Sequence, residues 1–145
     1  MNITTCEMSP KSYVATFSEK TNIVLHSSFS RTRYTFTAEQ CDERSLVAKW
    51  NIMSDKYGGH YAVGRDGDVL KCIDEDYWSH HLGTEKKYLA NNKSSIAVFL
   101  VNESYLEKEN GKMYAFGFSK PHNEYGGRFF EKSFQGYRYW ADYDI

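Results

Sequence analysis

The sequence predicts an α/β fold, in which one long helix packs on a small central mixed β-sheet. Three observations support it: a helical repeat of apolar residues between 46 and 53, an Asp-Gly turn between apolar runs at 60–73, and a continuous apolar run at 96–101. Elements in this order form a sheet with a helix on its face. We expect one domain over residues 1–145, with residues 1–20 as an N-terminal lead.

The first predicted strand is residues 22–26 (NIVLH), a short apolar run that should be buried and that ends in His26. A helix is expected from about 38 to 56. Thr37 to Gln40 has the form of a capping box before it, and Gly58-Gly59 should end it.

Three later segments are typical of strands. Residues 60–64 and 69–73 flank an Asp-Gly turn, the strongest short hairpin signal. Residues 96–101 are continuously apolar, which indicates a strand inside the sheet. Asn110-Gly111 predicts a second hairpin that continues into 113–116, whereas the aromatic tail at 129–143 has no clear pattern.

Composition excludes several classes of function. The net charge of −1 and the absence of a basic stripe argue against nucleic-acid binding. No apolar run is long enough for a membrane span, and residues 1–13 lack the features of a signal peptide, so we expect synthesis in a cytoplasm. Three cysteines without a CxxC pair predict neither a disulfide framework nor a cysteine zinc site. The 17% aromatic content fits core packing and also a surface that stacks on sugars.

Four segments, in order, resemble the zinc N-acetylmuramoyl-L-alanine amidase and peptidoglycan-recognition family. They match its first core strand ending in a zinc-binding His, its HY…DG hairpin, its W-x-H-x-G turn and its N-x-x-SIGIE strand. The segments are residues 23–28 (IVLHSS), 59–69 (GHYAVGRDGDV), 77–83 (YWSHHLG) and 92–102 (NKSSIAVFLVN). The tail at 134–143 (FQGYRYWADY) also resembles a stretch before the last helix of phage and bacterial members. The resemblance thus covers nearly the whole chain.

The resemblance implies hydrolysis of the amide between the lactyl group of N-acetylmuramic acid and L-Ala. In the family, two His and one Asp or Cys hold zinc, and a Glu or Tyr positions the water. His26 matches the first ligand. The other two ligands follow the last helix in the family and have no matching positions before Ile145. The positions of the two usual bases hold Phe99 and Gly59.

The resemblance also implies a cleft lined by His26, His81, Trp78, His60 and Phe99. A rebuilt zinc site would join His26 and His81 to His122 or Glu124. For His60 a core or hydrogen-bonding role is the favoured alternative, and for Trp78 core packing is favoured over stacking on a sugar.

Three functions remain open. The chain can be an amidase whose missing ligands come from a partner chain or a longer product. It can be a non-catalytic module that binds peptidoglycan or packs in a phage particle, either released at lysis or built into the virion. The match can also be accidental, in which case His26 and His81 should lie far apart.

Overall fold

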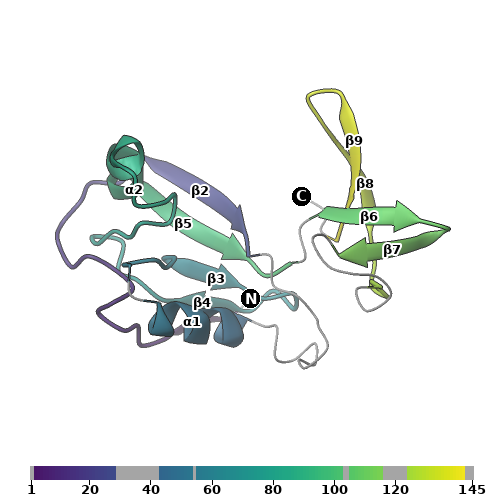
Figure 1. Ribbon diagram of the computed structural model, residues 1–145. Helices are drawn as coiled ribbons and strands as arrows, with labels where there is room; N and C mark the ends of the chain where they lie inside the picture. Colours follow the sequence, from purple (N-terminus) through teal and green to yellow (C-terminus); the bar gives the residue numbers. More distant parts are fainter. Residues whose placement is uncertain (1, 29–42, 54, 103–104, 116–123, 143–145) are drawn as a thin grey trace.

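The computed structural model describes residues 2–28, 43–53, 55–102, 105–115 and 124–142. Its strands form a sheet of five strands and a sheet of four, which stand side by side in Figure 1. The expected mixed α/β content is therefore confirmed. A single long helix is not found, because the described helices α1 and α2 are both short.

The larger sheet is mixed. Its strand order is β1 (Ile3–Thr5), β4 (Val69–Lys71), β3 (Tyr61–Val63), β5 (Ser95–Leu100) and β2 (Asn22–Ser27). Only the β3–β4 pair is antiparallel, and the other three pairs are parallel. The predicted strand at 96–101 has a neighbour on each side and is confirmed as internal. Strand β1 comes from the predicted N-terminal lead and forms one edge.

Helix α1 (Glu43–Ile52) covers one face of this sheet, next to β3 and β4 (Figure 1). Its apolar side chains pack on those of the strands that point toward it. The buried core consists of Met8, Leu46, Val47, Trp50, Ala62, Leu70, Cys72, Ile73, Ala97, Phe99 and Val101. This one-sided burial follows from the period of two in strands and of about 3.6 in the helix.

The predicted helix at 38–56 is too long at its C-terminal end. The helix ends at Ile52, and Lys56 takes a positive φ of 60° that cannot continue a right-handed helix. The backbone N–H of Lys56 donates instead to the carbonyl of Lys11, 3.0 Å away. The capping box at residues 37–40 lies outside the described residues.

Strand β2 was predicted as buried, and this is wrong. The strand forms as expected, but it lies at the edge of the sheet, where Ile23 is 70% exposed and Leu25 58% exposed. Their side chains point away from α1, whereas His26 points toward it. Phe99, which is paired with His26 in the register of β2 and β5, belongs to the core.

The predicted β3–β4 hairpin is confirmed. The backbone N–H of Gly64 donates to the carbonyl of Asp68 at 2.8 Å, and that of Asp68 donates to the Asp66 carboxylate at 3.0 Å. Gly67 has a φ of +88°, which favours glycine at this corner of the turn.

The smaller sheet consists of two hairpins. Its order is β7 (Lys112–Ala115), β6 (Tyr105–Glu109), β9 (Tyr137–Ala141) and β8 (Phe130–Phe134), and every pair is antiparallel. The predicted Asn110-Gly111 turn joins β6 to β7. The unassigned tail forms the second hairpin around Gln135-Gly136, and all four turn residues have positive φ.

A 3-10 turn (η2, Lys86–Tyr88) and helix α2 (Leu89–Ser94) lead into β5. Asn92 holds this connection, since its side chain accepts from the N–H of Leu82 at 2.9 Å and donates to the carbonyl of Gly83 at 2.8 Å. These bonds fix the loop that carries His81 against the start of β5.

Candidate functional site

His26 lies near the C-terminal end of β2, beside Phe99 of β5. The imidazole and phenyl rings stack with centroids 4.3 Å apart and an interplanar angle of 13°. The parallel pairing of β2 and β5 places both residues at the same level on the face covered by α1. The sheet register therefore sets the orientation of His26.

His26 and His81 are in direct contact although they are 55 residues apart in the sequence. Nε2 of His26 lies 2.8 Å from Nδ1 of His81, and Nε2 of His81 lies 2.8 Å from Oγ of Ser95. The Ser95 hydroxyl donates to the carbonyl of Asn91 at 2.5 Å, so it accepts from His81. His81 then accepts from His26, which leaves Nδ1 of His26 with its lone pair.

Both histidines are held neutral. Burial, together with the smaller effect of the neighbouring charges of His26, His60 and Lys20, lowers the pKa of His81 to about 3. Burial also lowers the pKa of His26. At neutral pH the pair therefore acts through hydrogen bonds and lone pairs.

A cleft of about 310 Å³ opens beside His26, which we call the His26 cleft. Its walls come from the C-terminal end of β2, from α1 and from the chain that follows α1. The lining residues are His26, Ser27, Ser28, Leu46, Lys49, Trp50, Met53, Tyr57 and Phe99. Apolar walls with a few polar groups in a space of this size are typical of small-ligand sites.

Two polar residues of this cleft escaped the sequence analysis. Lys49 extends from the last turn of α1, and Tyr57 follows the helix. Burial and the charge of Asp55 raise the pKa of Tyr57, so its phenol remains a hydrogen-bond donor at neutral pH. The only signal for Lys49 is its spacing of three from Leu46, which places both on one face of the helix.

The structure separates the other expected cleft residues from this cleft. His60 is fully buried in the core: its Nε2 donates to the carbonyl of Tyr77 at 3.0 Å and its Nδ1 accepts from the N–H of Ala97 at 3.0 Å. Trp78 is buried against the N-terminal segment, where its Nε1 donates to the Thr16 hydroxyl at 3.0 Å. Both therefore hold the fold together.

Phe99 fills the space beside Gly59 and leaves no room for a side chain there. A Cβ atom on Gly59 would lie 2.5 Å from Cδ2 of Phe99 and 2.9 Å from Cη2 of Trp50. These distances are too short for any side chain at residue 59. The ring of Phe99 therefore depends on a glycine at residue 59.

The described residues do not assemble the zinc site that the resemblance implies. No third His, Cys or carboxylate joins His26 and His81 within the described ranges. Glu124 lies at the smaller sheet, where it accepts from Lys112 at 3.1 Å, and His122 lies outside those ranges. One other group in the described part could hold a metal ion: Glu43, Asp66 and Asp68, whose carboxylates suit a hard cation.

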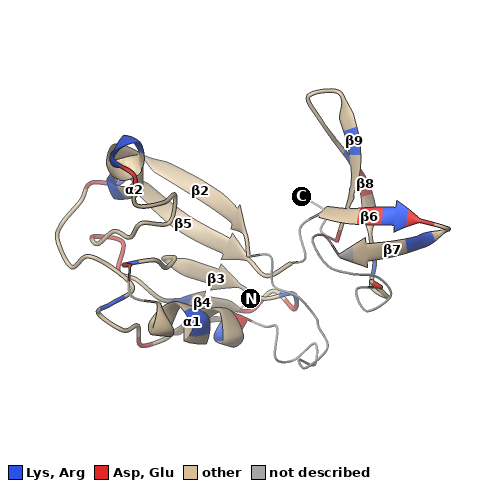
Figure 2. Cartoon of the chain, viewed as in Figure 1, with Lys and Arg blue, Asp and Glu red and all other residues tan. Residues whose placement is uncertain are grey.

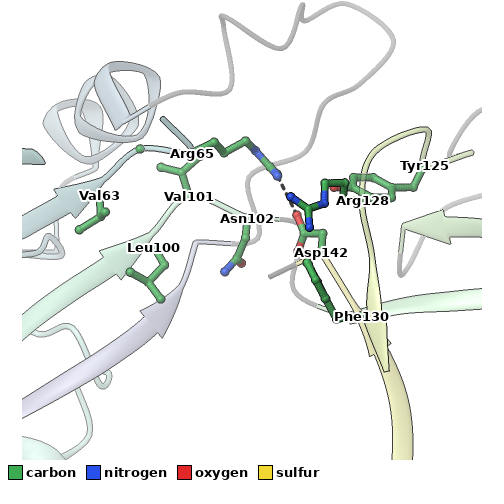
Figure 3. A pocket seen from close by; sticks show the side chains of 10 residues that line it. Val63, Arg65, Leu100, Val101, Asn102, Tyr125, Arg128, Phe130 and Asp142 are labelled. Atoms are coloured by element: carbon green, nitrogen blue, oxygen red, sulfur yellow. Dashed lines mark hydrogen bonds and ion pairs between the residues drawn. The ribbon is translucent and has the colours of Figure 1, made fainter. Parts of the chain in front are cut away.

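A second cavity of about 500 Å³ lies where the two sheets meet (Figure 3). An ion pair crosses it, with the guanidinium of Arg65 2.9 Å from the carboxylate of Asp142. The Asp142 side chain has no solvent exposure. This contact connects the β3–β4 turn to the residue that follows β9, and so links the two sheets.

Within the ranges that the structure describes, no helix has the length and apolarity needed to cross a membrane. No protein-family model matches the chain, and no significant match to a curated protein or to a solved structure was found.

Proposed function

We propose that the chain is an amidase-like module that engages peptidoglycan, binding a muramyl peptide in the His26 cleft without hydrolysing it. The contact between His26 and His81 carries this proposal. Two of the four segments that resemble the amidase and peptidoglycan-recognition family supply these residues, and a third supplies Phe99, which stacks on His26. An accidental match gives no reason for these three residues to meet.

The chemistry of the cleft suits a muramyl peptide. The ligand joins an N-acetylated sugar to a short peptide through a lactyl amide and carries a free carboxylate. Lys49 offers a cation for that carboxylate, and the Tyr57 phenol offers a donor for an amide carbonyl. Leu46 and Met53 give apolar walls for the methyl groups. A few polar groups in an otherwise apolar cleft provide orientation and specificity.

Two features argue against hydrolysis by the described residues. Phe99 has neither a carboxylate nor a hydroxyl with which to position water, and Gly59 leaves no alternative base beside it. His26 and His81 also bond to each other instead of converging on one point with a third ligand. We therefore expect the described residues to bind a muramyl peptide without hydrolysing its lactyl amide.

A titration with muramyl dipeptide, followed by the NMR signals of the protein, tests this proposal. We expect saturable shifts for residues that line the His26 cleft, and weaker binding in Lys49→Gln. Lys87→Gln is the matched control, because this exposed lysine pairs with Glu85 at the surface far from the cleft. The absence of saturable shifts, or equal affinity of Lys49→Gln and the unchanged chain, contradicts the proposal.

A second candidate function is an amidase completed by another chain or by residues outside the described part. It is favoured by Nδ1 of His26, which keeps its lone pair while Nε2 donates to His81, as metal-bound histidines commonly do. Zinc content of the purified chain, with His26→Ala as control, separates the two. Stoichiometric zinc that is lost in His26→Ala supports the amidase, and we expect none. A role in a phage particle, or release at lysis, is compatible with either function.

A further inference from the structure

The aromatic side chains of the smaller sheet gather on one of its two faces. Residues paired across antiparallel strands point to the same face, and alternate residues along a strand do so as well. The pairs Phe134–Tyr137, Lys132–Tyr139 and Phe130–Ala141 therefore share a face, which continues across β6 and β7. This aromatic face carries Phe130, Phe134, Tyr137, Tyr139, Tyr105 and Tyr114.

Leu106 and Met113, each 3% exposed, point to the opposite face together with Trp140. Ala141, which has no exposed surface, lies on the aromatic face, so that face is covered at this end. The aromatic face is instead open toward its hairpin tip, where Phe134 is 66% exposed and Tyr137 78% exposed. Exposed rings at the open end of this face indicate a contact surface.

The two most exposed rings of the aromatic face belong to residues that are paired across the hairpin. Phe134 and Tyr137 face each other directly across the Gln135-Gly136 turn. Farther along β8, the ammonium of Lys132 lies 5.5 Å from the Phe130 ring centroid. Residues paired on adjacent strands have neighbouring side chains on one face, so both rings can contact one ligand.

The charges on the aromatic face cancel. Lys112 and Lys132 are balanced by Glu107 and Glu109, and Figure 2 shows acidic positions on β6 and a basic one on the neighbouring β7. A nucleic acid needs basic groups that neutralise its phosphates, and this face has no excess of them. A neutral polymer with flat apolar ring faces matches the surface better.

We propose that the aromatic face binds a neutral polysaccharide, with Phe134 and Tyr137 stacking on pyranose rings. The C–H groups on one side of a pyranose carry partial positive charge and meet the negative face of an aromatic ring. The hydroxyl groups of Tyr137 and Tyr139 can bond to the sugar hydroxyls. This site is separate from the His26 cleft and does not depend on muramyl-peptide binding there.

Affinity electrophoresis of the full chain in gels with glycol chitin tests the inference. This neutral polymer of N-acetylated sugars has no lactyl or peptide group, so it probes the aromatic face and not the proposed muramyl-peptide site. We expect retardation of the unchanged chain and a loss of affinity of about threefold to tenfold in Tyr137→Ala or Phe134→Ala. Tyr137→Trp should retain binding because it keeps a ring.

Phe17→Ala is the matched control, since Phe17 is 75% exposed but belongs to the N-terminal segment. Circular dichroism establishes that each variant is folded. The inference is overturned if glycol chitin does not retard the unchanged chain, if Phe17→Ala weakens binding as much as Tyr137→Ala, or if both alanine variants bind normally. Binding of single-stranded oligothymidine through the same two rings, without binding of glycol chitin, assigns the face to nucleic acid instead.

Discussion

Gly59 and Phe99 occupy one space between them, because a Cβ atom on Gly59 would lie 2.5 Å from the Phe99 ring. Only the absence of a side chain at residue 59 lets the ring pack over His26 and against Trp50. Residues 59 and 99 are thus coupled in the core of this chain.

This coupling predicts the effect of Gly59→Ala. The new methyl group overpacks the core, so the free energy of unfolding should fall by about 1–3 kcal/mol. In a Phe99→Leu background, Gly59→Ala should lower the free energy of unfolding by a smaller amount. A double-mutant cycle by urea denaturation measures this difference. Gly126→Ala is the control, because a methyl group added there would meet no atom within 4 Å. Equal costs in both backgrounds would show that the two sites are independent.

The burial of His81, next to His26, predicts a pH dependence of stability. The pKa of His81 is about 3 in the folded chain and near 6.5 when unfolded, so the unfolded chain binds more protons between these values. The contribution of neutral His81 to the free energy of unfolding is fully present above pH 6.5 and is lost as the pH falls toward 3. We expect His81→Gln to flatten this part of the stability profile, whereas His80→Gln should not. A profile unchanged by His81→Gln refutes the assignment.

Cys6 and Cys72 lie close enough to respond to oxidation, with their sulfur atoms 3.3 Å apart. With oxidised glutathione, Cys6 should form a mixed disulfide and release one glutathione. The Cys72 thiolate then displaces the second glutathione and joins the residue after β1 to the residue after β4. Burial raises the pKa of Cys72, so this step should speed up at alkaline pH.

Mass spectrometry of the intact chain measures the cross-link as a loss of two hydrogen atoms. Cys6→Ser should abolish it. A stable glutathione adduct on Cys6, without the internal disulfide, would show that the two strands cannot move close enough.

The ion pair between Arg65 and Asp142 predicts how strongly the two sheets are joined. Asp142→Ala leaves the Arg65 guanidinium without its carboxylate, and we expect a loss of about 1–3 kcal/mol because Arg65 remains partly solvated. The matched exposed pair of Arg138 and Glu131, 3.2 Å apart, should contribute about 0–1 kcal/mol. Limited proteolysis should cut the Asp142→Ala chain faster between β5 and β6. Similar losses in Asp142→Ala and Arg138→Gln would contradict this.

The sequence predicts two of the hairpins well because their turns are local. Gly67, Asn110 and Gly111 take positive φ at fixed turn positions, and these residue types tolerate it. Gln135-Gly136 forms a turn with positive φ at both residues, but Gln is a poor signal for it, so the second hairpin of the smaller sheet escaped prediction. The aromatic run around it gave no clear alternation.

Properties that depend on distant packing could not be predicted in this way. The apolar run of β2 looks the same in an edge strand as in an internal one, and only the strand order exposes Ile23 and Leu25. His60 and His81 belong to similar polar and aromatic contexts in the sequence. Tertiary bonds place His60 in the core and His81 behind His26.

Cosedimentation of the chain with purified peptidoglycan sacculi, followed by analysis of the released peptides, tests the central claim most directly. The account predicts that the chain pellets with sacculi, that muramyl dipeptide competes, and that no stem peptide is released when zinc is added. A chain that stays in the supernatant, or that releases stem peptides by itself, would contradict it.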